Sequence, residues 1–236
     1  RRRTRTAMAN DEYSKHLYRP EPRAAAGSER LSLQGPAGHI EALLDTPTED
    51  RGRAVAIVCH PHPLYGGTMH NKVVHFLSKT FNNLGMPALR FNFRGVGETE
   101  GAYDEGVGET DDVLAITDAV AERFPGRAVW LAGLSFGAYV ALRASSERDY
   151  ERLITVAPAV NLYDFSQLTL PGMPWILVQG DQDEVVPSDQ VAAWVEQLDQ
   201  PPEMLWLEGA GHFFHGRLTD LRDGLIERLT PSGAAA

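Results

Sequence analysis

The sequence predicts an α/β protein with a mostly parallel sheet that helices cover on both faces. Short apolar runs alternate along the chain with segments in which apolar residues recur every three or four positions. Runs such as AVAIVC at residues 54–59 are apolar at nearly every position, which is typical of parallel strands buried on both faces. The alternation itself favours parallel pairing, because two parallel strands need a long crossover connection between them.

Strands are expected where short apolar runs lie between turn residues. They are expected at residues 31–33, 39–44, 54–59, 88–93, 128–134, 153–157, 175–179 and 204–207. Only a tight turn with Gly35, Pro36 and Gly38 separates the first two runs, which predicts an antiparallel pair at one edge of the sheet.

Helices are expected where apolar residues keep a helical period. They are expected at residues 70–84, 110–124, 136–146, 189–199 and 214–229. The second of these has Val113, Ile116 and Val120 on one face, and two aspartates at its positive N-terminal end. The last is extended back to residue 214 because Phe214 continues the apolar spacing that begins at Leu218.

The length of 236 residues fits one domain with a sizeable core, and we expect this folded domain at residues 29–230. Residues 1–28 are polar and are expected to form an arm that is disordered or derived from an expression vector. Within it, Met8 is expected to be the natural start, with residues 1–7 from a vector or an upstream reading frame. Residues 231–236 are expected to be a flexible tail.

The composition argues against several classes of partner. A net charge of −10 is unfavourable for binding nucleic acid or an anionic membrane surface. No apolar run approaches the roughly 20 residues that a membrane span needs, so we expect no membrane association and a cytoplasmic location. The single cysteine, Cys59, excludes an internal disulfide and fits a reducing compartment. The oligomeric state is left open.

The segment Gly133-Leu134-Ser135-Phe136-Gly137 lies between an expected strand and an expected helix. A G-x-S-x-G sequence in this context is typical of a nucleophilic serine held on a sharp, strained turn. The strand and the helix approach each other closely at such a turn, so the positions two before and two after the serine must lack bulk. Glycine fulfils this at both positions. The alternative interpretation is a glycine-rich turn whose serine only caps the helix.

A nucleophilic serine needs a base to take its proton and an acid to orient that base. Beyond a G-x-S-x-G turn, the acid and then the histidine follow in chain order. Asp183 follows the strand at 175–179 and best matches a G-x-x-D-x-x-V-P acid loop, whereas Asp181 is expected to hold that loop by hydrogen bonds. His212 in GAGH, after the last strand, is the predicted base. Its rival His215 is expected within the following helix, in a structural role.

Four segments are specific as a set, namely HPHPLYGGTMHNKVV, LRFNFRGVGETEG, AGLSFGAY and GAGHFFHG. Together they resemble the small bacterial lid-less serine α/β-hydrolases, related to the dienelactone hydrolase group. The resemblance covers residues 29–229 and implies the α/β-hydrolase fold with an eight-stranded sheet. Ser135 stands where dienelactone hydrolase has a cysteine. The connection at 158–174 is too short for a helical cap, which predicts that no substantial cap domain is present.

The resemblance also implies where an oxyanion would bind. One donor is the backbone N–H of Phe136, the residue after the nucleophile. The other lies in the loop after the strand at 54–59. Overlay on the family's His-Gly-x loop places it at His62, with Leu64 as the alternative, because the prolines on either side of His62 have no N–H.

These residues predict a serine hydrolase that cleaves small carboxylic esters of short chain length through an acyl-enzyme on Ser135, without a cofactor. Thioesterase and peptidase or amidase activity would use the same triad and stay open, as does a non-catalytic binding module on a hydrolase scaffold. No metal site is expected, because His60, His62, His70 and His75 have no carboxylates placed to complete one. His60 is instead expected to brace its loop by hydrogen bonding.

Overall fold

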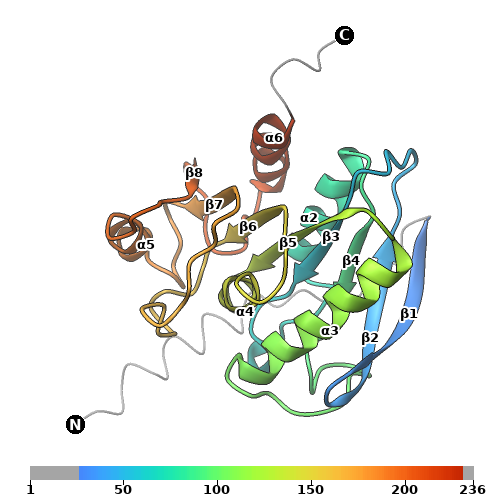
Figure 1. Cartoon of the computed structure of the whole chain (residues 1–236). Coiled ribbons are helices and arrows are strands. Elements are labelled where there is room, and N and C mark those ends of the chain that lie inside the picture. The colour runs from blue at the N-terminus through green and yellow to red at the C-terminus, as the bar shows by residue number, and fades with distance from the viewer. Residues whose placement is uncertain (1–26, 231–236) are drawn as a thin grey trace.

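The sheet has the predicted character. The structure is a computed structural model that describes residues 27–230, and within them eight strands form one sheet in the order β1-β2-β4-β3-β5-β6-β7-β8 (Figure 1). The strands are β1 (Ser28–Gly35), β2 (Gly38–Asp45), β3 (Ala54–Cys59), β4 (Ala88–Phe91), β5 (Ala128–Leu134), β6 (Arg152–Val156), β7 (Trp175–Gly180) and β8 (Glu203–Leu207). β2 pairs antiparallel with β1 and with β4, and the other pairs are parallel. This confirms the mostly parallel sheet with an antiparallel edge.

Helices cover both faces of this sheet, as predicted (Figure 1). They are α2 (Lys72–Asn83), α3 (Val107–Arg123), α4 (Phe136–Ala144), α5 (Ser188–Val195) and α6 (Leu218–Leu229), together with a short 3-10 helix, η1 (Pro63–Tyr65). The apolar faces of α3, α4 and α5 join one core, to which Val113, Val140 and Val191 contribute. α2 and α6 join a second core on the opposite face, with Leu77 and Leu225.

The strand order decides which loops meet. β3 pairs with β4 on one side and with β5 on the other, so the direction of winding reverses at β3. Ligands of open α/β sheets bind at the carboxyl ends of the strands beside such a reversal. The loop after β3 and the turn after β5 therefore lie next to each other at this edge, and the loops after β7 and β8 continue it.

The helix α3 begins at Val107, earlier than predicted. The reason is a side-chain cap that the apolar pattern does not reveal. The Glu109 carboxylate accepts hydrogen bonds from the N–H groups of Asp104 (2.9 Å) and Gly106 (2.8 Å), which satisfies donors at the helix start.

The helix α6 begins at Leu218, later than the prediction of residue 214. Phe214 has a φ of 51°, a left-handed conformation that a helix cannot contain, and its side chain is fully buried. It therefore belongs to the core without belonging to the helix, which is why its apolar spacing was misleading. His215 lies in the turn before α6, so its expected place within the helix was wrong.

The connection between β6 and β7 contains no helix in the residues that the structure describes, which confirms that no cap domain is present. None of the helices within residues 27–230 is long and apolar enough to cross a membrane. Most of the expected arm at 1–28 and the whole expected tail at 231–236 lie outside the described residues. Ser28 already belongs to β1, so the strand begins one residue before the predicted domain boundary.

Candidate active site

Ser135 occupies a strained turn between β5 and α4. Its φ of 56° and ψ of −112° are sparsely populated for a residue with a side chain, and such strain persists only where the surroundings enforce it. Here the Ser135 N–H donates to the Val156 carbonyl of β6 (2.8 Å), which fixes the turn against the neighbouring strand. This is the geometry that the sequence predicted for a serine presented at the carboxyl end of the sheet.

Two glycines make this turn possible, because other atoms occupy the space of their missing side chains. A Cβ at Gly133 would lie 2.1 Å from the Gly137 carbonyl oxygen, and one at Gly137 would lie 2.4 Å from the Cys59 carbonyl oxygen. Real Cβ atoms essentially never come so close to backbone. The G-x-S-x-G spacing therefore follows from the close approach of β5, α4 and the end of β3.

Asp183 and His212 lie side by side, with both side chains fully buried. The Nδ1 atom of His212 is 2.8 Å and 3.1 Å from the two carboxylate oxygens of Asp183. The carboxylate also accepts the N–H groups of Val185 (2.9 Å) and Val186 (2.7 Å) and the side-chain amide of Gln179 (3.1 Å). These bonds fix the carboxylate, so the imidazole that it orients is fixed as well.

The other two acids of this loop hold the backbone of the histidine loop. Asp181 accepts the N–H of Gly209 (2.7 Å), so this bond holds the histidine loop, whereas Asp181 was expected to hold its own loop. Glu184 accepts the N–H of His212 itself (3.2 Å), a role that sequence reasoning missed. The contact needs a glycine at Gly211, because a Cβ there would lie 2.7 Å from the Glu184 carboxylate and would displace it.

The loop after β3 carries His62, the predicted second oxyanion donor, which caps η1. Its ring atom Nδ1 accepts the N–H of Leu64 (3.1 Å), and its carbonyl accepts the N–H groups of Tyr65 (3.2 Å) and Gly67 (3.0 Å). The N–H of Leu64 is therefore already engaged, which disfavours Leu64 as the alternative donor. Phe136 is the first residue of α4, where N–H groups have no partner within the helix.

His60 braces this loop from within the core, where its side chain is fully buried. Its Nε2 accepts the N–H of Phe93 (3.0 Å), so the proton of the neutral ring is on Nδ1, which donates to the Pro61 carbonyl (2.6 Å). Burial lowers the pKa of His60 to about 3 and that of His62 to about 4, so both rings are neutral at ordinary pH. Within residues 27–230, no three His, Cys, Asp or Glu side chains are grouped to hold a metal ion.

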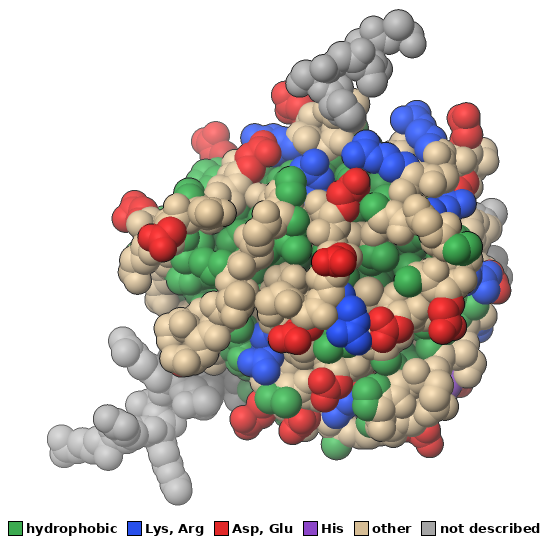
Figure 2. Space-filling view, viewed as in Figure 1, with side chains coloured by type: hydrophobic (Ala, Val, Ile, Leu, Met, Phe, Trp, Pro, Cys, Tyr) green, Lys and Arg blue, Asp and Glu red, His purple; other side chains and the backbone are tan. Residues whose placement is uncertain are grey.

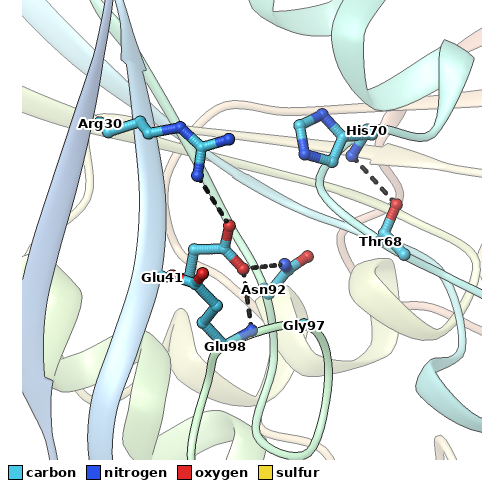
Figure 3. Close-up of a pocket in the computed structure, with 7 residues that line it drawn as sticks. All are labelled: Arg30, Glu41, Thr68, His70, Asn92, Gly97 and Glu98. Atoms are coloured by element: carbon cyan, nitrogen blue, oxygen red, sulfur yellow. Dashed lines mark hydrogen bonds and ion pairs between the residues drawn. The ribbon is translucent and has the colours of Figure 1, made fainter. Parts of the chain in front are cut away.

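β4 anchors the far end of the same loop at Met69. The Arg90 guanidinium donates to the Met69 carbonyl (2.8 Å), and the Asn92 side chain accepts the Met69 N–H (2.9 Å). Asn92 is in turn oriented by Glu41 of β2 (2.8 Å). Figure 3 shows this Asn92–Glu41 contact in a pocket of about 370 Å³ on the edge-strand side of the loop.

A buried ion pair fixes Arg90. Asp45 of β2 accepts two hydrogen bonds from its guanidinium (2.6 and 3.1 Å) and one each from Ser28 and Ser78. Burial alone would raise the pKa of Asp45, but the bonds and charge of Arg90 outweigh it and lower the pKa to about 2. The loop after β3 is thus tied to β4 and β2, which are distant in sequence.

Aromatic rings surround His62 next to the predicted nucleophile. Its ring centroid lies 4.6 Å from that of Tyr65, 4.8 Å from Tyr103 and 5.1 Å from Phe136. The Tyr103 hydroxyl bonds that of Tyr163 (3.1 Å), whose ring also packs on Phe136. These rings therefore pack around Phe136, the residue after Ser135 and one of the predicted oxyanion donors.

Comparisons with known proteins agree with this arrangement. Residues 51–171 match the model of a hydrolase family described as serine aminopeptidase, S33. An α/β serine hydrolase homologue from Coxiella burnetii is 46% identical with a TM-score of 0.82, and the match covers 86% of this chain and 97% of that one. A serine hydrolase without a lid from Xanthomonas campestris is 40% identical with a TM-score of 0.82, covering 92% and 98%.

An uncharacterised protein of Rickettsia prowazekii is also similar, with 36% identity over 85% of this chain and 88% of that protein. The fold, the strained turn at Ser135 and these relatives define a class, the lid-less α/β serine hydrolases. The chain belongs to the serine aminopeptidase S33 family of hydrolases.

Proposed function

We propose that this protein hydrolyses small carboxylic esters through an acyl-enzyme on Ser135. One observation carries the proposal: a serine on a strained strand-to-helix turn shares a sheet edge with a fully buried Asp183–His212 pair. The Asp183 carboxylate accepts three further protein hydrogen bonds beside the His212 ring, but such bonds alone would only stabilise the loop. The combination with a strained serine is what nucleophilic catalysis requires.

In this mechanism the Ser135 hydroxyl attacks the ester carbonyl while Nε2 of His212 takes its proton. Asp183 holds Nδ1–H of the ring and stabilises the imidazolium that forms. The backbone N–H groups of Phe136 and His62 stabilise the oxyanion. The imidazolium then protonates the leaving alcohol, and water, activated by the same histidine, releases the acid from Ser135.

The open edge favours small, exposed acyl groups, because the connection between β6 and β7 supplies no cap to enclose a long chain. The aromatic rings around His62 supply apolar surface for the acyl group. We infer that the enzyme needs no cofactor, since each step uses the chain's own groups. Peptide or amide hydrolysis is the second candidate, favoured by the family's description as serine aminopeptidase. Thioester hydrolysis would use the same groups.

The test is hydrolysis of p-nitrophenyl esters from acetate to decanoate, with acyl-thioesters and aminoacyl p-nitroanilides beside them. We expect the short esters to be the best substrates and Ser135→Ala to reduce their hydrolysis at least a thousandfold, on the order of what loss of a serine nucleophile costs. Faster hydrolysis of the anilides would establish the peptidase alternative. Activity on none of these substrates would favour the non-catalytic binding module.

We propose further that the substrate is a small molecule met in the cytoplasm, with no nucleic-acid or membrane partner. The only cysteine of the chain, Cys59, is a buried free thiol, which suits a reducing compartment. Figure 2 shows acidic and basic side chains interspersed over the face that carries α3, without the basic stripe that nucleic-acid binding requires. Binding to nucleic acid or anionic vesicles at physiological salt would contradict this.

A further inference from the structure

The direction of the His62 N–H depends on a single peptide plane, the one that joins Pro61 to His62. A trans peptide places its C=O and its N–H on opposite sides of the C–N bond. Whatever fixes the Pro61 carbonyl therefore also fixes the His62 N–H, the predicted oxyanion donor.

The His60 imidazole fixes this carbonyl. Its Nδ1–H donates to the Pro61 oxygen at 2.6 Å, while its Nε2 accepts the N–H of Phe93 at 3.0 Å. The second bond determines the tautomer, because a backbone N–H can only donate. Nδ1 must then carry the proton of the neutral ring, so the ring can only point a donor at Pro61.

Gly67 packs against the Pro61–His62 peptide from another direction. A Cβ on Gly67 would lie 2.0 Å from the Pro61 oxygen and 2.7 Å from the His62 oxygen. The Gly67 N–H also donates to the His62 carbonyl (3.0 Å). The peptide is therefore enclosed by backbone, and it has little room to rotate while the His60 bond is in place.

Phe93 connects this brace to the second predicted donor. Its ring packs edge-on against His60, at a centroid distance of 4.6 Å, and against Phe136 at 5.5 Å. Phe93, just after β4, thus contacts both His60 and Phe136, the residue that carries the second predicted donor. A hydrogen bond to a peptide carbonyl also polarises the amide, which makes its N–H a stronger donor.

We infer that His60 is a positioning residue for transition-state stabilisation: through the Pro61 carbonyl it aims the His62 N–H at the oxyanion. This inference rests on the proposed function and extends it to a residue that touches neither substrate nor Ser135. Because an oxyanion develops fully only in the tetrahedral state, a misdirected donor lowers kcat and leaves KM nearly unchanged.

Two substitutions at one position separate this role from general packing. In His60→Asn the amide nitrogen lies near the place of Nδ1, so it can still donate to Pro61 but cannot reach the Phe93 N–H. In His60→Gln the amide lies near the place of Nε2, so it can accept from Phe93 but leaves the Pro61 carbonyl without its donor. Each variant loses one buried hydrogen bond and part of a ring, so their thermal stabilities are expected to fall similarly.

The measurement is kcat and KM for a short p-nitrophenyl ester, with the affinity for a boronic acid that forms a tetrahedral adduct on serine. We expect His60→Gln to lose about ten- to a hundredfold in kcat, somewhat less than removal of a whole oxyanion donor. Its KM should stay close to the wild-type value, and its boronic acid affinity should fall by a similar factor. His60→Asn should retain most of the wild-type kcat. Equal losses of kcat in the two variants would overturn the inference.

Gly67→Ala disturbs the Pro61–His62 peptide without altering a buried polar side chain. It therefore tests whether the orientation of this peptide sets kcat even if a variant at position 60 does not fold. It should lower kcat with little change in KM, and a wild-type kcat would overturn the inference. Gly172→Ala is the matched control, because a Cβ there meets nothing within 4 Å. The proposed function fails separately: it is refuted if the wild type hydrolyses no ester or if Ser135→Ala remains active.

Discussion

The two halves of the candidate site are held in place by different means. On the acid–base side, three carboxylates of one short loop bind the next loop along the sheet, through Gly209, His212 and the imidazole. On the oxyanion side, the neutral, buried His60 holds the peptide between Pro61 and His62, which backbone atoms enclose. The far end of the same loop is anchored at Met69 through Asn92 and Glu41 of β2. A carboxylate therefore contacts the histidine of the half that moves protons. In the other half the groups next to the predicted oxyanion donor are neutral, and the charged Arg90 and Glu41 act on the far end of the loop, from β4 and β2.

This difference has a chemical reason. A carboxylate beside His212 stabilises the imidazolium that forms during the reaction. A carboxylate or a second proton beside the oxyanion donors would change the charge at a place that must stabilise an anion. Burial keeps His60 and His62 neutral by lowering the pKa of each.

The largest expected effect is a loss of kcat when the Asp183 carboxylate is replaced by a neutral amide. Asp183→Asn keeps an oxygen that can accept the N–H groups of Val185 and Val186, so the fold should remain. It removes the charge and favours the wrong tautomer of His212, and kcat should fall by about ten-thousandfold. Steady-state kinetics measures this, with Asp181→Asn as the control that should stay near wild type. Similar losses in both variants would show that loop order, and not the Asp183 charge, matters.

A smaller effect is expected where the two halves meet. Gly137 is the second residue of α4 and packs against the end of β3, where an added Cβ would lie 2.4 Å from the Cys59 oxygen and 2.5 Å from the His60 oxygen. Gly137→Ala should lower the free energy of unfolding by about 1–3 kcal/mol, as overpacking does, and should reduce activity by shifting both Ser135 and the loop after β3. Denaturant unfolding checks the first part. Gly172→Ala should change neither, and unaltered stability in Gly137→Ala would contradict the close approach.

The smallest effect concerns acid stability on the oxyanion side. Burial, assisted by the charge of Arg90, lowers the pKa of His75 in α2 from 6.5 to about 4. Between these pH values the unfolded chain binds a proton that the folded protein does not, so the free energy of unfolding falls as the pH falls. Replacing His75 by Gln lowers the difference in bound protons between the unfolded and the folded state by up to one. Urea unfolding between pH 7 and pH 4.5 should show a shallower decline for the variant, and identical declines would contradict the assignment.

The sequence predicts the acid–base half of the site well, because its signals are local. Asp183 and His212 each stand just past a strand in a short loop, and the structure places them within hydrogen-bond distance. Their catalytic roles, with that of Ser135, stay predictions. The parallel sheet and both helical layers were also predictable, since each element carries its own apolar period.

The oxyanion half could be predicted only in part, because its contacts join distant segments. β4 lies between β2 and β3, an order that the chain does not reveal. The partners of His60 and Met69 are therefore Phe93 and Asn92. The expectation that His60 braces its loop agrees with these bonds, but neither its partners nor the Arg90–Asp45 pair could be derived. Glu184 was missed because no residue pattern separates it from an ordinary solvated carboxylate.

The central claim, a nucleophilic Ser135 in a folded enzyme, is tested most directly by covalent trapping. The protein is incubated with a fluorophosphonate, and the modified residue is located by peptide mass spectrometry. The account predicts a single adduct on the 133–137 segment at Ser135, absent in Ser135→Ala and formed much more slowly in Asp183→Asn. No adduct on the folded wild-type protein, or an adduct that persists in Ser135→Ala, would contradict it.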